Sequence, residues 1–115
     1  MIREIIFFET HFIELYQIQN TKIKRKIQYV FELLKQVDRV PEKFLKHLTG
    51  TNGLYEIRIK YQSNSYRVFC CFDEGKLVVL FNAFLKKTQK TPINELERAK
   101  KLMKLYFKYK DKRNG

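Results

Sequence analysis

The stretch LYEIRIKYQSNSYRVFCCFDEGKLVVLFNAFLKK, residues 54–87, predicts three antiparallel β-strands. Segments 54–61, 65–72 and 77–84 are rich in Ile, Val, Tyr and Phe, which is typical of strands. Two short polar turns separate them, QSNS and DEGK, and Gly75 in the second suits a tight hairpin. The chain therefore contains a meander, and the remaining elements are placed around it.

The first strand of the meander has two chemically different faces. Because side chains alternate along a strand, its Tyr and Ile residues share one face, whereas Glu56, Arg58 and Lys60 share the other. Antiparallel sheets commonly have one solvated face, so we expect the charged face to be exposed to solvent. Arg67 on the second strand joins this face, and FLKKTQK after the third strand adds more cations. Clustered cations repel one another unless an anion joins them, which predicts a phosphate site.

Helices and one more strand flank the meander. Residues 2–8, IREIIFF, are typical of a short strand, and a first helix is expected at 12–20. Residues 22–37 repeat apolar side chains at spacings of three and four, which predicts a second helix. A last helix opens at Thr91-Pro92, with Thr91 as its N-cap and Pro92 in its first turn. This order predicts an α+β fold in which an N-terminal strand, a helical hairpin and a C-terminal helix accompany an antiparallel sheet, with the helices on one face.

Two smaller features complete the predicted organisation. Thr21 is expected to cap the second helix. Pro41 starts the segment PEKFLKHL, residues 41–48, which is expected to be a short helical or irregular link.

Length, charge and cysteine usage limit the classes of function. The 115 residues fit a single domain, 1–115, and the net charge of +12 points to a polyanionic partner such as RNA, DNA, an acidic protein or an anionic membrane surface. No secretion signal or membrane-spanning stretch is visible. Cys70 and Cys71 point to opposite faces of one strand, so a disulfide between them would be strained, and a reducing, cytoplasmic location is expected. A metal or another cofactor is not expected, because His11, His47 and the adjacent cysteines do not form a ligand set.

The segment from His47 to Leu102 resembles the HigB-like branch of the RelE/ParE toxin superfamily. The resemblance rests on GLYEIRIKY, YRVFCCFDEGKLVVLFNAFLKKTQKTP and NELERAKKL, and the run FLKKTQKTP before a helix is a recurrent feature of that branch. It implies a RelE-like fold and the toxin of a type II toxin-antitoxin system. Such a toxin is a ribosome-dependent mRNA endonuclease that inhibits translation and is held inactive by a cognate antitoxin, expected here to be a helix-turn-helix protein.

The resemblance also assigns site residues. Arg67 in SYRV matches the most regular basic active-site position, Arg58 matches a basic position on the preceding strand, and Lys87 matches a position often held by Arg. Glu56 falls where some relatives carry a carboxylate proposed as general base and others carry lysine. The His or Tyr that the best-known nucleases keep near the C-terminal end has no clear counterpart after Lys87. The residues expected to contact RNA phosphates are Lys60, Lys86, Lys90 and His47.

Metal-free RNA cleavage gives these residues distinct roles. Arg67 and Arg58 are expected to clamp phosphate oxygens, Glu56 to take a proton from the ribose 2′-hydroxyl, and Lys86 or Lys87 to give one to the leaving oxygen. Replacing Arg67 by Ala is expected to remove about 2–4 kcal/mol of transition-state stabilisation. It is expected to change the folding stability by less than about 1 kcal/mol, as at a half-exposed site. The alternative is that Arg67 pairs with Glu56 or Asp73 across the sheet, in which case its loss lowers the melting temperature.

Two alternative functions belong to other classes. ParE-like members of the superfamily are non-catalytic gyrase poisons, and they generally do not need the set Glu56, Arg58, Arg67 and Lys87. A plain RNA-binding or ribosome-associated domain is the other alternative, for which the basic C-terminal helix would suffice.

Overall fold

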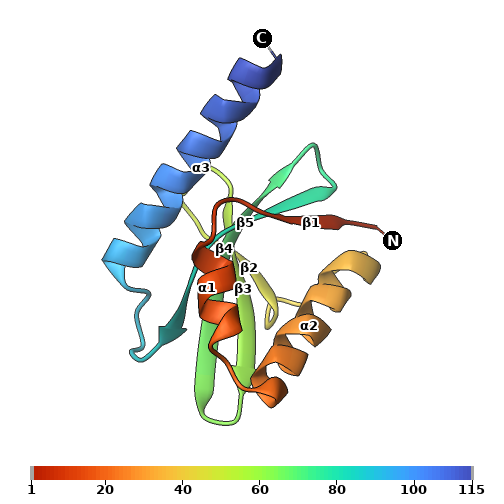
Figure 1. The fold of residues 1–115 in the computed structure, drawn as a ribbon, viewed down its shortest axis with the longest axis vertical. Helices are drawn as coiled ribbons and strands as arrows, with labels where there is room; N and C mark the ends of the chain where they lie inside the picture. The colour runs from red at the N-terminus through yellow and green to blue at the C-terminus, as the bar shows by residue number, and fades with distance from the viewer. Residues whose placement is uncertain (1, 115) are drawn as a thin grey trace.

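A computed structural model describes residues 2–114 and confirms the α+β fold class (Figure 1). A five-stranded sheet with strand order β1-β5-β4-β3-β2 forms the centre of the molecule. The elements in chain order are β1 (Glu4–Phe7), α1 (His11–Gln17), α2 (Thr21–Gln36), β2 (Leu45–His47), β3 (Leu54–Tyr61), β4 (Asn64–Asp73), β5 (Leu77–Lys86) and α3 (Ile93–Asn114).

The predicted meander is confirmed. Strand β3 has the predicted bounds, and antiparallel pairing with β4 runs from Leu54 opposite Cys71 to Tyr61 opposite Asn64. Strand β5 also pairs antiparallel with β4 and extends two residues beyond the predicted end at 84, to Lys86. The strands therefore carry the first lysine of FLKKTQK on the sheet itself.

The sheet is mixed, whereas an antiparallel sheet was predicted. Strand β1 pairs parallel with β5, with Glu4 opposite Leu77. The segment 41–48 was predicted as a link, but it contains β2, which pairs antiparallel with β3. At three residues, β2 is too short for an alternating pattern to be recognised in the sequence.

Helices cover both faces of the sheet, so the prediction that they share one face was wrong. Helices α1 and α2 pack on the face that carries Ile57 and Cys70, and α3 packs on the face that carries Phe69 and Cys71. Strands β4 and β5 contain the runs VFCCF and LVVLF, which have no polar position. Continuous apolar runs are typical of strands buried on both faces, and this pattern was present in the sequence.

The helix starts differ slightly from the predicted caps. The side chain of Asn20, and not that of Thr21, accepts a hydrogen bond from the Ile23 N–H at 2.9 Å and caps α2. Helix α3 begins at Ile93, and the Thr91 hydroxyl is used elsewhere. No helix within residues 2–114 combines the length and the apolar character needed to cross a membrane.

Both cysteines are buried and free, as expected of structural strand residues. Burial raises the pKa of Cys71 to about 12 and raises that of Cys70 well above its ordinary value. Both thiols therefore stay protonated at neutral pH and are poor nucleophiles.

Two polar contacts hold α3 against the sheet. The first lies at a β-bulge, where Phe81 and Asn82 of β5 both face the single residue Phe69 of β4. Asn82 Nδ2 donates to the backbone oxygen of Glu95 at 2.9 Å and to its Oε1 at 3.0 Å, which fixes the first turn of α3.

The second contact fixes the C-terminal half of α3 to the end of β4. Tyr106 Oη and Lys110 Nζ each donate to the Asp73 carboxylate at 2.7 Å. Burial opposes ionisation of Asp73, but the hydrogen bonds from Lys110 and Tyr106 outweigh it and hold the pKa of Asp73 below its usual value. Burial, together with the bond to Asp73, raises the pKa of Tyr106 to about 12, so this phenol stays a donor.

We predict that Asp73→Asn lowers the melting temperature at pH 7. A carboxyl group with a lowered folded-state pKa stabilises the fold above its unfolded pKa, and this contribution is lost as the pH falls through the folded pKa. The difference between the wild-type and Asn proteins should therefore shrink below about pH 4. Thermal unfolding of both proteins across this range is the measurement, with the exposed Asp111→Asn as control. A difference that stays constant with pH would contradict the assignment.

Candidate phosphate-binding site

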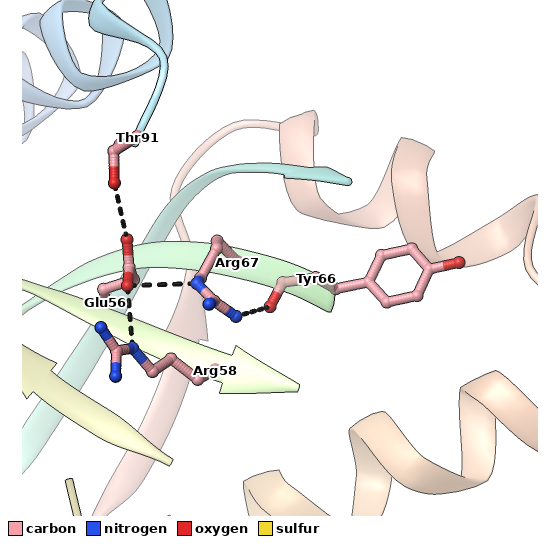
Figure 2. Close-up of polar contacts among 5 residues, drawn as sticks. All are labelled: Glu56, Arg58, Tyr66, Arg67 and Thr91. Atoms are coloured by element: carbon pink, nitrogen blue, oxygen red, sulfur yellow. Dashed lines mark hydrogen bonds and ion pairs between the residues drawn. The ribbon is translucent and has the colours of Figure 1, made fainter. Parts of the chain in front are cut away.

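One buried carboxylate lies at the centre of the charged residues on the α3 face of the sheet. Glu56 Oε1 is 3.0 Å from Arg58 Nε and 3.2 Å from Arg67 Nε (Figure 2). Arg58 and Arg67 are direct cross-strand partners, so without the carboxylate two guanidinium groups would face each other. Glu56 is therefore the anion that allows the two arginines to lie side by side.

The face of β3 and β4 that carries Glu56, Arg58 and Arg67 was predicted to be exposed to solvent, but it is largely buried. The side chain of Glu56 is 1% exposed, that of Arg67 13% and that of Arg58 27%. Helix α3 packs on the apolar part of this face, and the loop before it brings Thr91 to Glu56; neither could be placed from the strand pattern alone. The expectation that Arg67 is an exposed cation among unpaired cations was wrong, and the alternative that it pairs with Glu56 is confirmed.

The Thr91 hydroxyl reaches the same carboxylate from the loop between β5 and α3. Thr91 Oγ1 donates to Glu56 Oε2 at 3.4 Å, a long hydrogen bond (Figure 2). Both oxygens of Glu56 thus have partners within the protein. The predicted N-cap residue instead links the loop to the arginine pair.

The guanidinium of Arg67 lies in an environment that only partly satisfies its charge and its hydrogen-bond donors. Its Nε lies within ion-pair distance of Glu56 without hydrogen-bond geometry, and its Nη1 donates to the Tyr66 carbonyl oxygen at 3.3 Å. Burial lowers the pKa of Arg67 from its ordinary value, Glu56 opposes this effect, and the neighbouring Arg58 adds to it. An additional anion at the guanidinium would relieve the same imbalance.

A pocket of about 410 Å³ opens beside Arg67. Its wall carries three cationic side chains together with hydroxyl and amide groups. All of these groups are hydrogen-bond donors, which is the composition suited to phosphate oxygens. The lining residues are Ser65, Arg67, Lys86, Lys87, Thr88 and Gln89.

The structure brings most of the sequence-predicted site residues together. Arg67, Lys86 and Lys87 line the pocket, and Arg58 and Glu56 lie directly behind Arg67. Lys60 is exposed and lies opposite Ser65 on the neighbouring strand, next to the pocket. Lys90 is exposed in the following loop and is not among the residues that line the pocket.

His47 is not brought to the pocket. It pairs with Tyr55 across β2 and β3, and the two rings are 5.1 Å apart. Tyr55 belongs to the face covered by α1 and α2, which is opposite to the face of Arg67. His11 Nε2 lies 3.1 Å from Glu9 Oε1 at the start of α1.

Four polar residues of the site were missed in the sequence. Ser65, Thr88 and Gln89 line the pocket, and Thr91 contacts Glu56. In the sequence, only Thr91 and the basic run KKTQK pointed to this part of the site, and the prediction for Thr91 was a helix cap. Within residues 2–114 no group of three or more His, Cys, Asp or Glu side chains is arranged to hold a metal ion.

Comparison with known proteins identifies the family of the chain. The family model described as "Phage derived protein Gp49-like (DUF891)" matches residues 17–104, which include α2, the whole meander and the pocket. The chain belongs to the phage-derived Gp49-like family. No curated protein matches it.

We predict that Arg67→Ala destabilises this Gp49-like protein by about 1–3 kcal/mol, because a buried carboxylate then keeps only one guanidinium partner. Chemical denaturation of the purified protein measures this change. Lys60→Ala, at an exposed position on the same face, should stay within about 0.5 kcal/mol of wild type. Equal stabilities for the two variants would mean that the Glu56–Arg67 contact adds nothing to folding.

We also predict that Thr91→Val loosens the loop that carries Lys87. Valine keeps the shape but removes the donor to Glu56 Oε2, which should cost about 0.5–1.5 kcal/mol and weaken the binding of inorganic phosphate. Thr91→Ser should retain both properties. Thr49→Val is the matched control, because Thr49 is exposed and is not among the residues that line the pocket. Calorimetric titration with phosphate and thermal unfolding test the pair, and identical Val and Ser variants would contradict the role.

Proposed function

We propose that this protein is the toxin of a type II toxin-antitoxin system and that it cleaves mRNA on the ribosome. The observation that carries the proposal is the arginine pair held on Glu56 beside a pocket that Arg67, Lys86 and Lys87 line and that has no acidic residue in its wall. Membership of a phage-derived family and the resemblance of FLKKTQKTP to HigB-like toxins support it.

The proposed reaction is transesterification at an RNA phosphodiester. The ribose 2′-oxygen forms a bond to phosphorus while the bond from phosphorus to the 5′-oxygen breaks. The proton of the 2′-hydroxyl passes to water, and the 5′-oxygen gains a proton, which gives a 2′,3′-cyclic phosphate and a 5′-hydroxyl. The main demand on the protein is therefore to stabilise the negative charge that develops on the phosphate oxygens.

The side chains divide this work by their positions. Arg67 and Lys86 line the pocket and are proposed to bind the phosphate oxygens, with Arg58 behind them. Lys87, also in the lining, is proposed to give the proton to the 5′-oxygen. The sequence-based proposal made Glu56 the general base, but its buried position and engaged oxygens favour a positioning role for the arginines.

The partners follow from the same proposal. We propose that the protein acts in the cytoplasm on ribosome-bound mRNA without a cofactor, and that a cognate antitoxin, expected to be a helix-turn-helix protein, holds it inactive. A pocket of donors that an antitoxin can cover would allow such control. A small helix-turn-helix reading frame adjacent to the gene would add support.

We predict that the purified protein cuts mRNA within translated frames when ribosomes are present. Arg67→Lys should lower kcat by about 10²–10³, because lysine keeps the charge but loses the fork of donors that matches phosphate. Lys22→Gln, an exposed change on α2, should leave the rate unchanged. Mapping 5′ ends of a defined mRNA in a reconstituted translation reaction gives the rates.

Two outcomes would overturn the proposal. An Arg67→Lys protein that is folded and fully active would remove the pocket from the mechanism. A wild-type protein that leaves mRNA intact but inhibits DNA supercoiling by gyrase would support the ParE-like alternative.

A further inference from the structure

Helix α3 has a row of cations on the face that points away from the sheet. Its apolar side chains, among them Ala99, Met103 and Tyr106, pack against the sheet. Figure 1 shows α3 on the outside of the molecule, with its C-terminal end projecting beyond the strands. Successive cations on the outer face are three or four residues apart and all are exposed: Arg98, Lys101, Lys104, Lys108 and Lys112. We refer to these five residues as the α3 row.

No ion pair among the described residues includes a member of the α3 row. The ion pairs of α3 join Lys100 to Glu97 and Lys110 to Asp73 and Glu74. Glu95 is occupied by Asn82. Like charges at spacings of three and four destabilise a helix, so the row works against the fold unless a polyanion covers it.

The α3 row continues from the candidate site. The loop that carries Lys87 and Lys90 leads directly into α3, and the Asn82–Glu95 contact fixes the first turn of the helix. With a rise of about 1.5 Å per residue, the row extends for roughly 21 Å along the helix. This length corresponds to several phosphates of one RNA strand.

We propose that the α3 row is a second RNA-binding surface, which binds the phosphodiester backbone outside the pocket and does so without base preference. Four of the five side chains are lysines, which act as point charges and suit backbone contacts better than bidentate recognition of a base. The surface needs no cleavage chemistry, so it does not depend on the proposed nuclease activity.

Helix α2 provides a matched control, because it is also strongly basic. Its cations are Lys22, Lys24, Arg25, Lys26 and Lys35. They differ from the α3 row in two respects. Lys24 lies 5.5 Å from the centre of the Tyr16 ring and Lys26 lies 5.0 Å from that of Tyr29, so aromatic faces already engage part of this charge. In addition, α2 covers the face of the sheet opposite to the pocket.

The experiment compares two triple variants with equal net charge. Lys101→Gln, Lys104→Gln, Lys108→Gln changes the α3 row, and Lys22→Gln, Arg25→Gln, Lys26→Gln changes α2, so each lowers the net charge from +12 to +9. Fluorescence anisotropy measures the affinity for oligouridylate RNA at several KCl concentrations. The α3 variant should bind at least about tenfold more weakly at low salt, and its slope of log K against log [KCl] should fall by about 2. The α2 variant should match the wild type.

Three results would overturn the proposal. The first is an equal loss in both variants, which would mean that only net charge matters. The second is an unchanged α3 variant. The third is stronger binding of poly-L-glutamate than of RNA, which would assign the surface to an acidic protein. Thermal unfolding checks that each variant is folded. If the α3 triple variant is unstable, the single variant Lys104→Gln replaces it, and its slope of log K against log [KCl] should change by about 0.7.

The test separates this proposal from the nuclease proposal. If no cleavage is found but the α3 triple variant loses RNA affinity, the nuclease proposal fails and the second surface stands. If Arg67→Lys abolishes cleavage while the α3 triple variant binds oligouridylate like wild type, the nuclease proposal stands and the second surface fails.

Discussion

The ion pairs of Glu56 with Arg58 and Arg67 are the interaction on which the rest of the site depends. A buried carboxylate is costly unless its charge is compensated, and here two guanidinium groups from adjacent strands compensate it. A shift of the β3–β4 register by one residue would turn Arg67 to the opposite face and leave Glu56 with Arg58 alone. The register of the meander and the geometry of the arginine pair therefore support each other.

Helix α3 and the loop before it lie on the face of the sheet that carries the charged residues. Asn82 fixes the first turn of α3 and Asp73 fixes its C-terminal half, so the helix packs against the apolar part of this face, and the loop before it brings Thr91 to the buried Glu56. The pocket beside Arg67 remains open, with Lys86 and Lys87 in its wall. Covering the carboxylate while leaving the cations accessible is what makes the face suitable for an anion.

The protein uses its two kinds of cation in different environments. The two arginines of the site lie partly buried on the sheet, where a planar fork can satisfy several acceptors at once. Lys87, Lys90 and the four lysines of the α3 row lie at exposed positions, where a hydrated point charge costs little to hold. This division separates a site for one phosphate from a surface for a longer polyanion.

The sequence by itself determined the meander, the amphipathic second helix and the convergence of Arg67, Lys86 and Lys87, because these follow from alternation, helical spacing and hairpin register. It did not determine the parallel pairing of β1, the short strand β2 or the face chosen by α3, which depend on contacts between distant segments. For the same reason only the tertiary structure showed that Glu56 is buried, that Thr91 contacts it and that His47 lies on the far face. A strand pattern shows which residues share a face, but packing decides what covers that face.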